Sequence, residues 1–293
     1  MPLGEVFSER QAPSARGSPF DTARLGPLQP MIEVPTATSE LRVCGSDCRA
    51  WTDWRGSSQD NRVAWKAICS VLLLGYGAWY FSLVADSATL LIIGAVWVIK
   101  LVVEIWGQHT PTWACPGSWQ LFLVVYALGL PSVVWMFGAC RVVDVDFPHR
   151  ETAGLALYLF GSSYSLGYEV HRFRWKARPE NQGKLHTVGL ATYCIHPNYF
   201  GDLFTYGGWG LACGTQCAMS LSPVSLFYLT LFVVPNSDAY LAQKYPDEFP
   251  AYLAKTARLI PGVRSRAAAH ALAWAGLLVS FYLQINCGAA CGM

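Results

Sequence analysis

The chain has 293 residues, of which 53% are hydrophobic and 14% are charged, and its formal net charge is +2. This composition is too apolar for an ordinary soluble domain and predicts a membrane protein with several spans. The small net charge gives no general case for binding nucleic acid. The 12 Trp and 14 Tyr suit aromatic belts at the two membrane surfaces.

Residues 1–60 form a polar amino-terminal extension without an apolar run. It lacks the hydrophobic core of a signal peptide, and its acidic residues outnumber its arginines, which is unlike a transit peptide. We interpret it either as a flexible tail or as an arm that a partner orders. Trp51 and Trp54, close to the first apolar run, would anchor such an arm.

The rest of the chain predicts an all-α, polytopic fold with about seven transmembrane helices. The expected spans are Val63–Ala85, Ala88–Trp106, Trp119–Cys140, Thr152–Val170, Pro197–Gly214, Pro223–Leu241 and Ala267–Ile285. We treat 61–266 as one membrane domain and 267–293 as an added carboxy-terminal helix. The loops after the fourth and sixth spans hold most of the Lys and Arg, so the positive-inside rule places them, with the amino terminus, in the cytoplasm, matrix or stroma.

Two charged residues lie within the second expected span. Lys100 and Glu104 are four residues apart, so they share a helix face and can pair. Charged groups inside a span usually face a bundle interior or a cavity. Both also lie near the helix end, where they could instead extend to the membrane surface. Glu104 is our candidate for a buried catalytic acid, on the logic of burial and not of a motif.

Ten cysteines include three pairs with four-residue spacing: Cys44/Cys48, Cys213/Cys217 and Cys287/Cys291. None has the spacing of a zinc site, so we predict no metal centre. Most of the other cysteines lie in apolar runs, where Cys acts as a small hydrophobic residue. Disulfides within the pairs are the alternative interpretation.

The stretch Leu185–Gly214 organises the chain. A polar run, His196-Pro197-Asn198-Tyr199-Phe200-Gly201-Asp202, opens an apolar, glycine-rich segment. Proline suits the first turn of a helix, whose positive end favours anions. We expect this run to lie on the same side as a basic loop, His171–Lys184, and together they suggest a site for an anionic cofactor. The alternative is that these charges serve only topology and the lipid surface.

These residues resemble the carboxy-terminal signature of the steroid 5-alpha-reductase-like membrane proteins, in particular a subgroup of relatives with an H-P-N-Y-F-G motif. The upstream run from Phe173 through Lys184 and the closing segment from Tyr240 to Pro261 are also similar to that family. The isoprenylcysteine carboxyl methyltransferases share this layout and are distantly similar. The resemblance covers about Glu169–Gly262.

The resemblance implies an enzyme that uses NADPH to reduce an activated C=C bond of a lipid or sterol. It implicates around the cofactor Asn181, Lys184, His196, Asn198, Tyr199, Asp202, Tyr245 and Tyr252. We expect an integral protein of the endoplasmic reticulum or of an organellar membrane, mitochondrial inner or plastid, in contact with membrane lipids.

The chain departs from the subgroup at several positions. Ile195 stands where an Arg is usual, Asp202 replaces Glu, and Asn236-Ser237-Asp238 replaces a charged pair. Lost cofactor contacts together with terminal extensions suggest a second hypothesis, a non-catalytic accessory subunit of a respiratory or photosynthetic membrane complex. A third hypothesis, a methyltransferase using S-adenosylmethionine, is disfavoured by the intact P-N-Y-F-G run and by the absence of a paired Glu on the sixth span.

Overall fold

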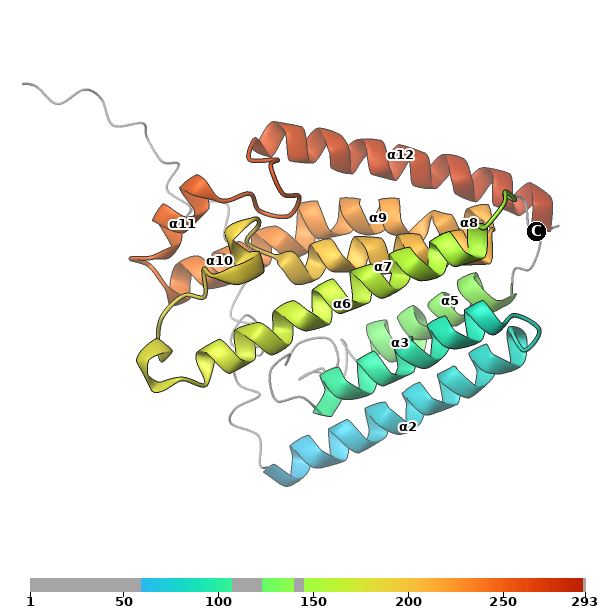
Figure 1. Cartoon of the computed structure of the whole chain (residues 1–293), viewed down its shortest axis with the longest axis horizontal. Helices are drawn as coiled ribbons and strands as arrows, with labels where there is room; N and C mark the ends of the chain where they lie inside the picture. Colours follow the sequence, from blue (N-terminus) through green and yellow to red (C-terminus); the bar gives the residue numbers. More distant parts are fainter. Residues whose placement is uncertain (1–58, 107–122, 140–144, 292–293) are drawn as a thin grey trace, which may run out of the picture. The chain divides into compact units, whose positions relative to one another are not determined.

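The computed structural model describes residues 59–106, 123–139 and 145–291, which all belong to one compact unit, Ser46–Met293. Within these ranges every regular element is a helix, apart from one isolated parallel bridge between Cys194 and Ala257 (Figure 1). The all-α prediction is therefore confirmed for this part of the chain. Most of the predicted extension, 1–60, and the start of the third expected span lie outside the described residues.

Five helices in these ranges have 17 or more residues. They are α2 (Gln59–Leu83), α3 (Ala88–Trp106), α6 (Arg150–Lys176), α7 (Pro197–Cys213) and α12 (Arg266–Cys291). The shorter elements are η3 (Leu123–Gly129), α5 (Leu130–Val134), η4 (Trp135–Ala139), η5 (Pro179–Asn181), η6 (Gly189–Thr192), α8 (Gln216–Met219), α9 (Leu221–Tyr228), η7 (Leu229–Val233), α10 (Val234–Lys244) and α11 (Phe249–Lys255). Here η3, η4 and η7 are π-helical segments, whereas η5 and η6 are 3₁₀ turns.

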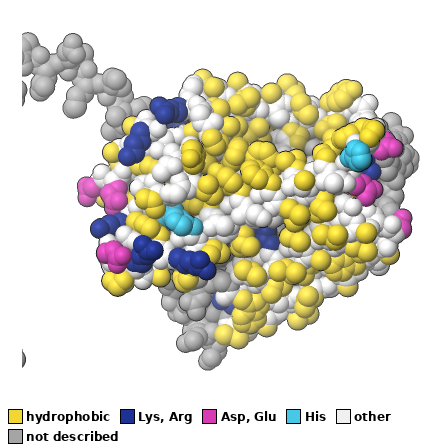
Figure 2. Space-filling view, viewed as in Figure 1, with side chains coloured by type: hydrophobic (Ala, Val, Ile, Leu, Met, Phe, Trp, Pro, Cys, Tyr) yellow, Lys and Arg dark blue, Asp and Glu magenta, His cyan; other side chains and the backbone are white. Residues whose placement is uncertain are grey.

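Four helical stretches in the described ranges are long and apolar enough to cross a membrane. They are Val63–Leu83, Ala88–Trp106, Gln216–Lys244 and Arg266–Asn286. Hydrophobic side chains are spread over the face in Figure 2, and most of the charged side chains lie toward its two ends. These features fit an integral membrane protein.

The number of such stretches is smaller than the seven spans that we predicted. The fourth expected span lies in α6, whose middle is polar and whose last turn is basic. The fifth is α7, which has only 17 residues, fewer than the roughly 20 needed to span a bilayer. The described part of the third gives only a shorter apolar helix, Val125–Gly138.

The expected basic loop, His171–Lys184, is also only partly a loop. Helix α6 continues to Lys176, so the first half of this stretch is helical. Arg and Lys are good helix formers, and the end of the apolar run therefore did not end the helix.

An aromatic cluster centred on Trp209 holds α7 against its neighbours. The Trp209 ring is fully buried and stacks on Phe137 with centroids 4.3 Å apart. It also meets the rings of Tyr80, Trp97 and Tyr158 at 5.4–5.8 Å. Its indole N–H donates to the Tyr80 hydroxyl at 3.0 Å. This one side chain thus links α2, α3, η4, α6 and α7.

Glycines bring the α6 and α7 backbones together. A Cβ on Gly161 would lie 2.4 Å from the Thr205 nitrogen, and one on Gly208 would lie 2.3 Å from the Tyr158 nitrogen. Small residues at such crossings let membrane helices approach closely. The close approach fixes how the polar side chains of α7 face those of α6.

Cys69, Cys194 and Cys213 are thiols and are buried, so they act as core residues. The Cys213 thiol donates a hydrogen bond to the Phe137 carbonyl at 3.2 Å. This is the behaviour of a small core side chain. Cys217 is disulfide-bonded, and because Cys213 is a thiol, this bond does not lie within the Cys213/Cys217 pair.

Candidate functional site

The polar run that organises the sequence forms the start of α7. His196 is the residue before the helix and Pro197 is in its first turn, as the sequence predicts. Next to it the backbone pairs with the closing segment: the Ile195 N–H donates to the Ala257 carbonyl at 2.8 Å, and the His196 N–H donates to the Arg258 carbonyl at 3.1 Å. These two backbone hydrogen bonds join the start of α7 to the closing segment.

A histidine–carboxylate–arginine chain lies at this helix start. His196 Nε2 is 2.9 Å from Asp238 Oδ1, and Arg258 Nε donates to Asp238 Oδ2 at 2.8 Å. The imidazole stacks on the Tyr199 ring, with centroids 5.4 Å apart, and the Tyr199 hydroxyl is 3.4 Å from Ser237 Oγ. A carboxylate on one ring nitrogen fixes the orientation of an imidazole. His196 is thus held in one position by α10 and the closing segment.

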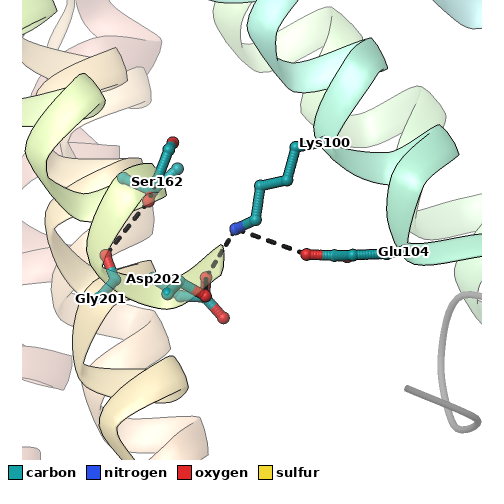
Figure 3. A network of polar contacts seen from close by, with 7 residues as sticks. Lys100, Glu104, Ser162, Gly201 and Asp202 are labelled. Carbon is teal, nitrogen blue, oxygen red and sulfur yellow. Dashed lines mark hydrogen bonds and ion pairs between the residues drawn. The ribbon is translucent and has the colours of Figure 1, made fainter. Parts of the chain in front are cut away.

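A second polar cluster lies deeper, between α3, α6 and α7 (Figure 3). Lys100 Nζ is 3.0 Å from Asp202 Oδ1 and 3.8 Å from Glu104 Oε1. Ser165 Oγ donates to the same oxygen of Asp202 at 3.1 Å. The side chains of Lys100 and Glu104 are 9% and 10% exposed. Of the two alternatives left open by the sequence, the structure thus shows both charges inside the bundle.

This cluster joins two residues to which we assigned different roles. Glu104 was predicted as the acid and Asp202 as a contact of the cofactor, and Lys100 bridges them. Asp202 reaches α3 because the glycine contacts draw α7 onto α6, where Ser165 also faces it.

The other predicted cofactor residues lie around α11 and the loop before α7. Asn181 donates from Nδ2 to the Trp175 carbonyl at 2.9 Å. Lys176 donates to the Tyr245 hydroxyl at 2.9 Å and to the backbone carbonyl of Lys184, whose side chain is exposed. The structure brings these residues to the end of the unit where α6 ends and α11 lies (Figure 1).

Tyr252 and Asn198 complete the predicted set. The Tyr252 hydroxyl is buried and donates to the Ala191 carbonyl at 2.6 Å. Burial raises the pKa of Tyr252, so its hydroxyl stays protonated and serves as a donor. Asn198 is half-buried in the first turn of α7. Tyr252 therefore fixes the loop that leads into α7.

Ile195 occupies a buried apolar position. It is 4% exposed and belongs to a cluster with Leu185, Tyr168 and Tyr252. The place where the subgroup usually has an Arg is here part of a hydrophobic core. At this position the chain therefore has apolar packing by Ile195 and not a polar contact from an arginine.

His186 is buried beside this cluster in an unusual setting. Its ring meets those of Tyr168, His171 and Trp175 at 5.6, 5.3 and 5.1 Å. Neither ring nitrogen has a hydrogen-bond partner among the described residues. Burial, together with the nearby His171, Arg172 and Lys176, lowers the pKa of His186 to about 4, so the ring is neutral at pH 7.

Sequence reasoning missed two members of the site. Asp238 was noted only as a departure from the family pattern, and Arg258 only as part of the closing segment. Their signal was the polar run Asn236–Asp238 within an otherwise apolar stretch, because a charged residue there needs a partner. In the described residues no group of three or more His, Cys, Asp or Glu could hold a metal ion.

NADPH would require cations and backbone donors for its phosphates. Arg258 is 35% exposed and binds Asp238 through Nε, and no described residue accepts from its two terminal nitrogens. The first turn of α7 adds N–H groups at a positive helix end. Arg178 and Lys184 are exposed at the same end of the unit. This donor set fits an anionic cofactor at the start of α7.

The four apolar helical stretches in the described ranges and the buried charges are consistent with a helical integral membrane protein. The sequence model of the family described as protein of unknown function (DUF1295) matches residues 102–256, more than half of the chain. The chain belongs to this family, which is steroid 5-alpha-reductase-like. No curated protein and no solved structure matches the chain. The matched range includes Glu104, Asp202 and the His196–Asp238 pair, and Lys100 lies just before it.

Proposed function

We propose that this chain is a membrane enzyme of the H-P-N-Y-F-G subgroup that uses NADPH to reduce a C=C bond in a lipid or sterol. The observation that carries the proposal is the buried cluster of Lys100, Glu104 and Asp202. Ionisable side chains inside a membrane bundle are costly and commonly mark functional sites. The class of reaction is taken from the resemblance of the His196–Asp202 run to the steroid 5-alpha-reductase-like proteins.

In this proposal the two clusters divide the work. In the proposal, Arg258 and the first turn of α7 hold the phosphates, together with the exposed side chains of Arg178 and Lys184. His196, fixed by Asp238 and stacked on Tyr199, orients the ligand at the helix start. NADPH, when bound, supplies a hydride to one carbon of the double bond.

Glu104 supplies the matching proton in this scheme. A proton leaves its carboxyl oxygen for the substrate, and the carboxylate that forms is stabilised by the Lys100 ammonium. Asp202 keeps Lys100 in place through its 3.0 Å contact. One hydride and one proton together saturate the double bond, and Glu104 regains its proton from water. The bundle around the cluster keeps most water away from it.

Titration of the purified full-length chain with NADPH tests binding. Wild type should bind saturably, and His196→Ala and Arg258→Gln should each weaken binding by about tenfold or more, since charge-assisted contacts contribute about 1.5–3 kcal/mol each. Arg264→Gln, an exposed arginine in the turn before α12, is the matched control and should bind as wild type does.

Glu104→Gln separates binding from chemistry. It should bind NADPH normally and lose substrate-dependent NADPH oxidation by about 10²-fold or more, which is the usual contribution of a general acid. An enone lipid is the probe substrate. If the Glu104→Gln variant oxidised NADPH as fast as wild type in the presence of the substrate, Glu104 would not be the acid.

A second candidate is a non-catalytic accessory subunit of a larger membrane complex. It is favoured by the internal bonds of the predicted cofactor residues, most of which contact other protein groups: Asn181, His196, Tyr199, Asp202, Tyr245 and Tyr252. These bonds support the fold without any ligand. Absence of NADPH binding in every variant, with co-purification in a large assembly, would select this candidate over the enzyme.

For the membrane we propose the endoplasmic reticulum or an organellar membrane, mitochondrial inner or plastid. The support is the family resemblance and the four apolar helical stretches. Fractionation of cells that express a tagged full-length chain decides among these membranes.

A further inference from the structure

One face of α6 is hollowed along its second half. A hollow of about 400 Å³ is lined by Ser163, Leu166, Gly167, Val170, His171 and Arg174. These positions recur every three or four residues, so they share one helix face. Toward the carboxyl end of the helix, this face changes from small and apolar side chains to His171 and the cationic Arg174.

A second hollow, of about 500 Å³, continues the first. Gly167 and His171 line both, and the loop before α7 closes the second with Gly189, Leu190, Thr192 and Tyr193. Hollows of these volumes have the usual size of small-molecule sites. The two hollows therefore form one groove between the end of α6 and this loop.

Gly167 makes the room for this groove. A Cβ at Gly167 would meet nothing within 4 Å, whereas Gly154 and Gly161 of the same helix are pressed against α7. The groove is thus on a side of α6 that α7 does not cover. Val170 and Tyr193 are 38% and 63% exposed along it.

The charge of the groove is positive at one end. Arg174 is exposed and has no ion pair among the described residues. The nearest carboxylate along α6, Glu169, is engaged by Arg172 at 2.6 Å. His186 packs behind Tyr168 and His171 as a neutral ring and adds no charge. An anion entering the groove would meet Arg174 and His171.

We propose that this groove binds an anionic phospholipid, with its phosphate at Arg174 and His171 and an acyl chain over Gly167 toward Ser163. The order of polarity along α6 is that of a lipid standing in a leaflet, apolar below and charged at the surface. Basic residues at a membrane surface attract anionic lipids by about 1 kcal/mol each. This site is separate from the start of α7 and does not depend on the reductase proposal.

Native mass spectrometry of the full-length chain in detergent tests the site with two lipids that share acyl chains, dioleoylphosphatidylglycerol and dioleoylphosphatidylcholine. Wild type should bind the phosphatidylglycerol more tightly. Arg174→Gln should weaken the binding of phosphatidylglycerol by about tenfold and leave the binding of phosphatidylcholine nearly unchanged. Arg264→Gln, an exposed arginine outside the groove, is its control and should leave both lipids unchanged.

Filling the groove tests the acyl-chain half. Gly167→Leu should weaken the binding of both lipids, because the leucine side chain would fill the space that the acyl chain occupies in the proposal. Gly75→Leu is the matched control, since Gly75 is also a helical glycine with nothing within 4 Å of its Cβ position. Loss of binding with Gly75→Leu as well would indicate a general effect on the bundle and would overturn the assignment.

Competition distinguishes the sources of phosphate. Inorganic phosphate and NADPH should not displace the bound phosphatidylglycerol. Displacement by inorganic phosphate alone would show that the groove is a simple phosphate site and not a lipid site. Displacement by NADPH would assign the groove to the cofactor. Equal affinity of wild type for the two lipids, or unchanged binding in Arg174→Gln, would also overturn the proposal. A lack of NADPH binding would refute only the reductase proposal.

Discussion

Replacing Lys100 by Met tests whether the interior charge cluster is a unit. Met keeps the length and apolar stem of the side chain and removes its charge. The Asp202 carboxylate would then lie between the helices without its cation. Breaking a buried ion pair by removing one partner costs about 3–5 kcal/mol. Asp202 is 26% exposed, and water screens part of its charge, so we expect about 3 kcal/mol.

Asp202→Asn should cost less than Lys100→Met. Lys100 would lose the 3.0 Å contact but keep Glu104 at 3.8 Å, which predicts a loss of about 1.5 kcal/mol. The double variant Lys100→Met/Asp202→Asn should be more stable than Lys100→Met alone, because the unbalanced Asp202 carboxylate is gone. The two substitutions should therefore not be additive.

Unfolding in mixed micelles with increasing dodecyl sulfate measures these differences. Lys255→Met is the control, because Lys255 is an exposed lysine on α11, and it should change stability by no more than about 0.5 kcal/mol. A Lys100→Met protein as stable as this control would show that the cluster is not a buried ion pair. Additive effects in the double variant would show that Lys100 and Asp202 act independently.

Three further predictions follow from single positions. Gly208→Ala should destabilise the bundle by about 1–3 kcal/mol, because its Cβ would lie 2.3 Å from the Tyr158 nitrogen; the same unfolding assay with Gly167→Ala as the open-space control checks this. Wild type should lose stability as the pH falls from about 6.5 through 4, because His186 is protonated at its ordinary pKa in the unfolded chain and only near 4 in the folded chain. Melting curves at several pH values measure this dependence of stability on pH. His186→Phe should reduce the dependence, and an unchanged dependence would contradict the prediction. Ile195→Arg should lower stability and folded yield and not improve NADPH binding, because Ile195 is 4% exposed in an apolar cluster; tighter NADPH binding by a stable variant would contradict this.

Helix positions were predictable where apolar runs have clear ends. The expected second span, Ala88–Trp106, is the observed α3, and the first-turn proline placed the start of α7 correctly. The number of membrane-crossing stretches was not predictable in the same way. Segment α6 is a long helix with a polar middle, and α7 is a short one that packs on it through glycines. Hydropathy measures how apolar a segment is, and it does not show which helices pack together and bury each other's polar side chains.

Contacts within one helix were predictable in the site, and contacts between helices were not. The four-residue spacing of Lys100 and Glu104 predicted their pairing. The bond from Lys100 to Asp202 spans 102 residues and depends on how closely α7 approaches α6. The bond from His196 to Asp238 depends in the same way on the position of α10. A sequence shows that such buried charges need partners, and only the packing selects them.

The two polar clusters are joined by a single rigid element. Asp202 follows His196 by six residues, which is about 9 Å along α7 at 1.5 Å per residue. His196 is anchored to α10 and the closing segment, and Asp202 to α3 and α6. A ligand that shifts the start of α7 must therefore also strain the contact between Asp202 and Lys100, which holds Glu104 within reach. In an enzyme this connection would link cofactor binding to the placement of the acid. In an accessory subunit the same bonds would hold α7 fixed, and the position of Glu104 would not respond to NADPH.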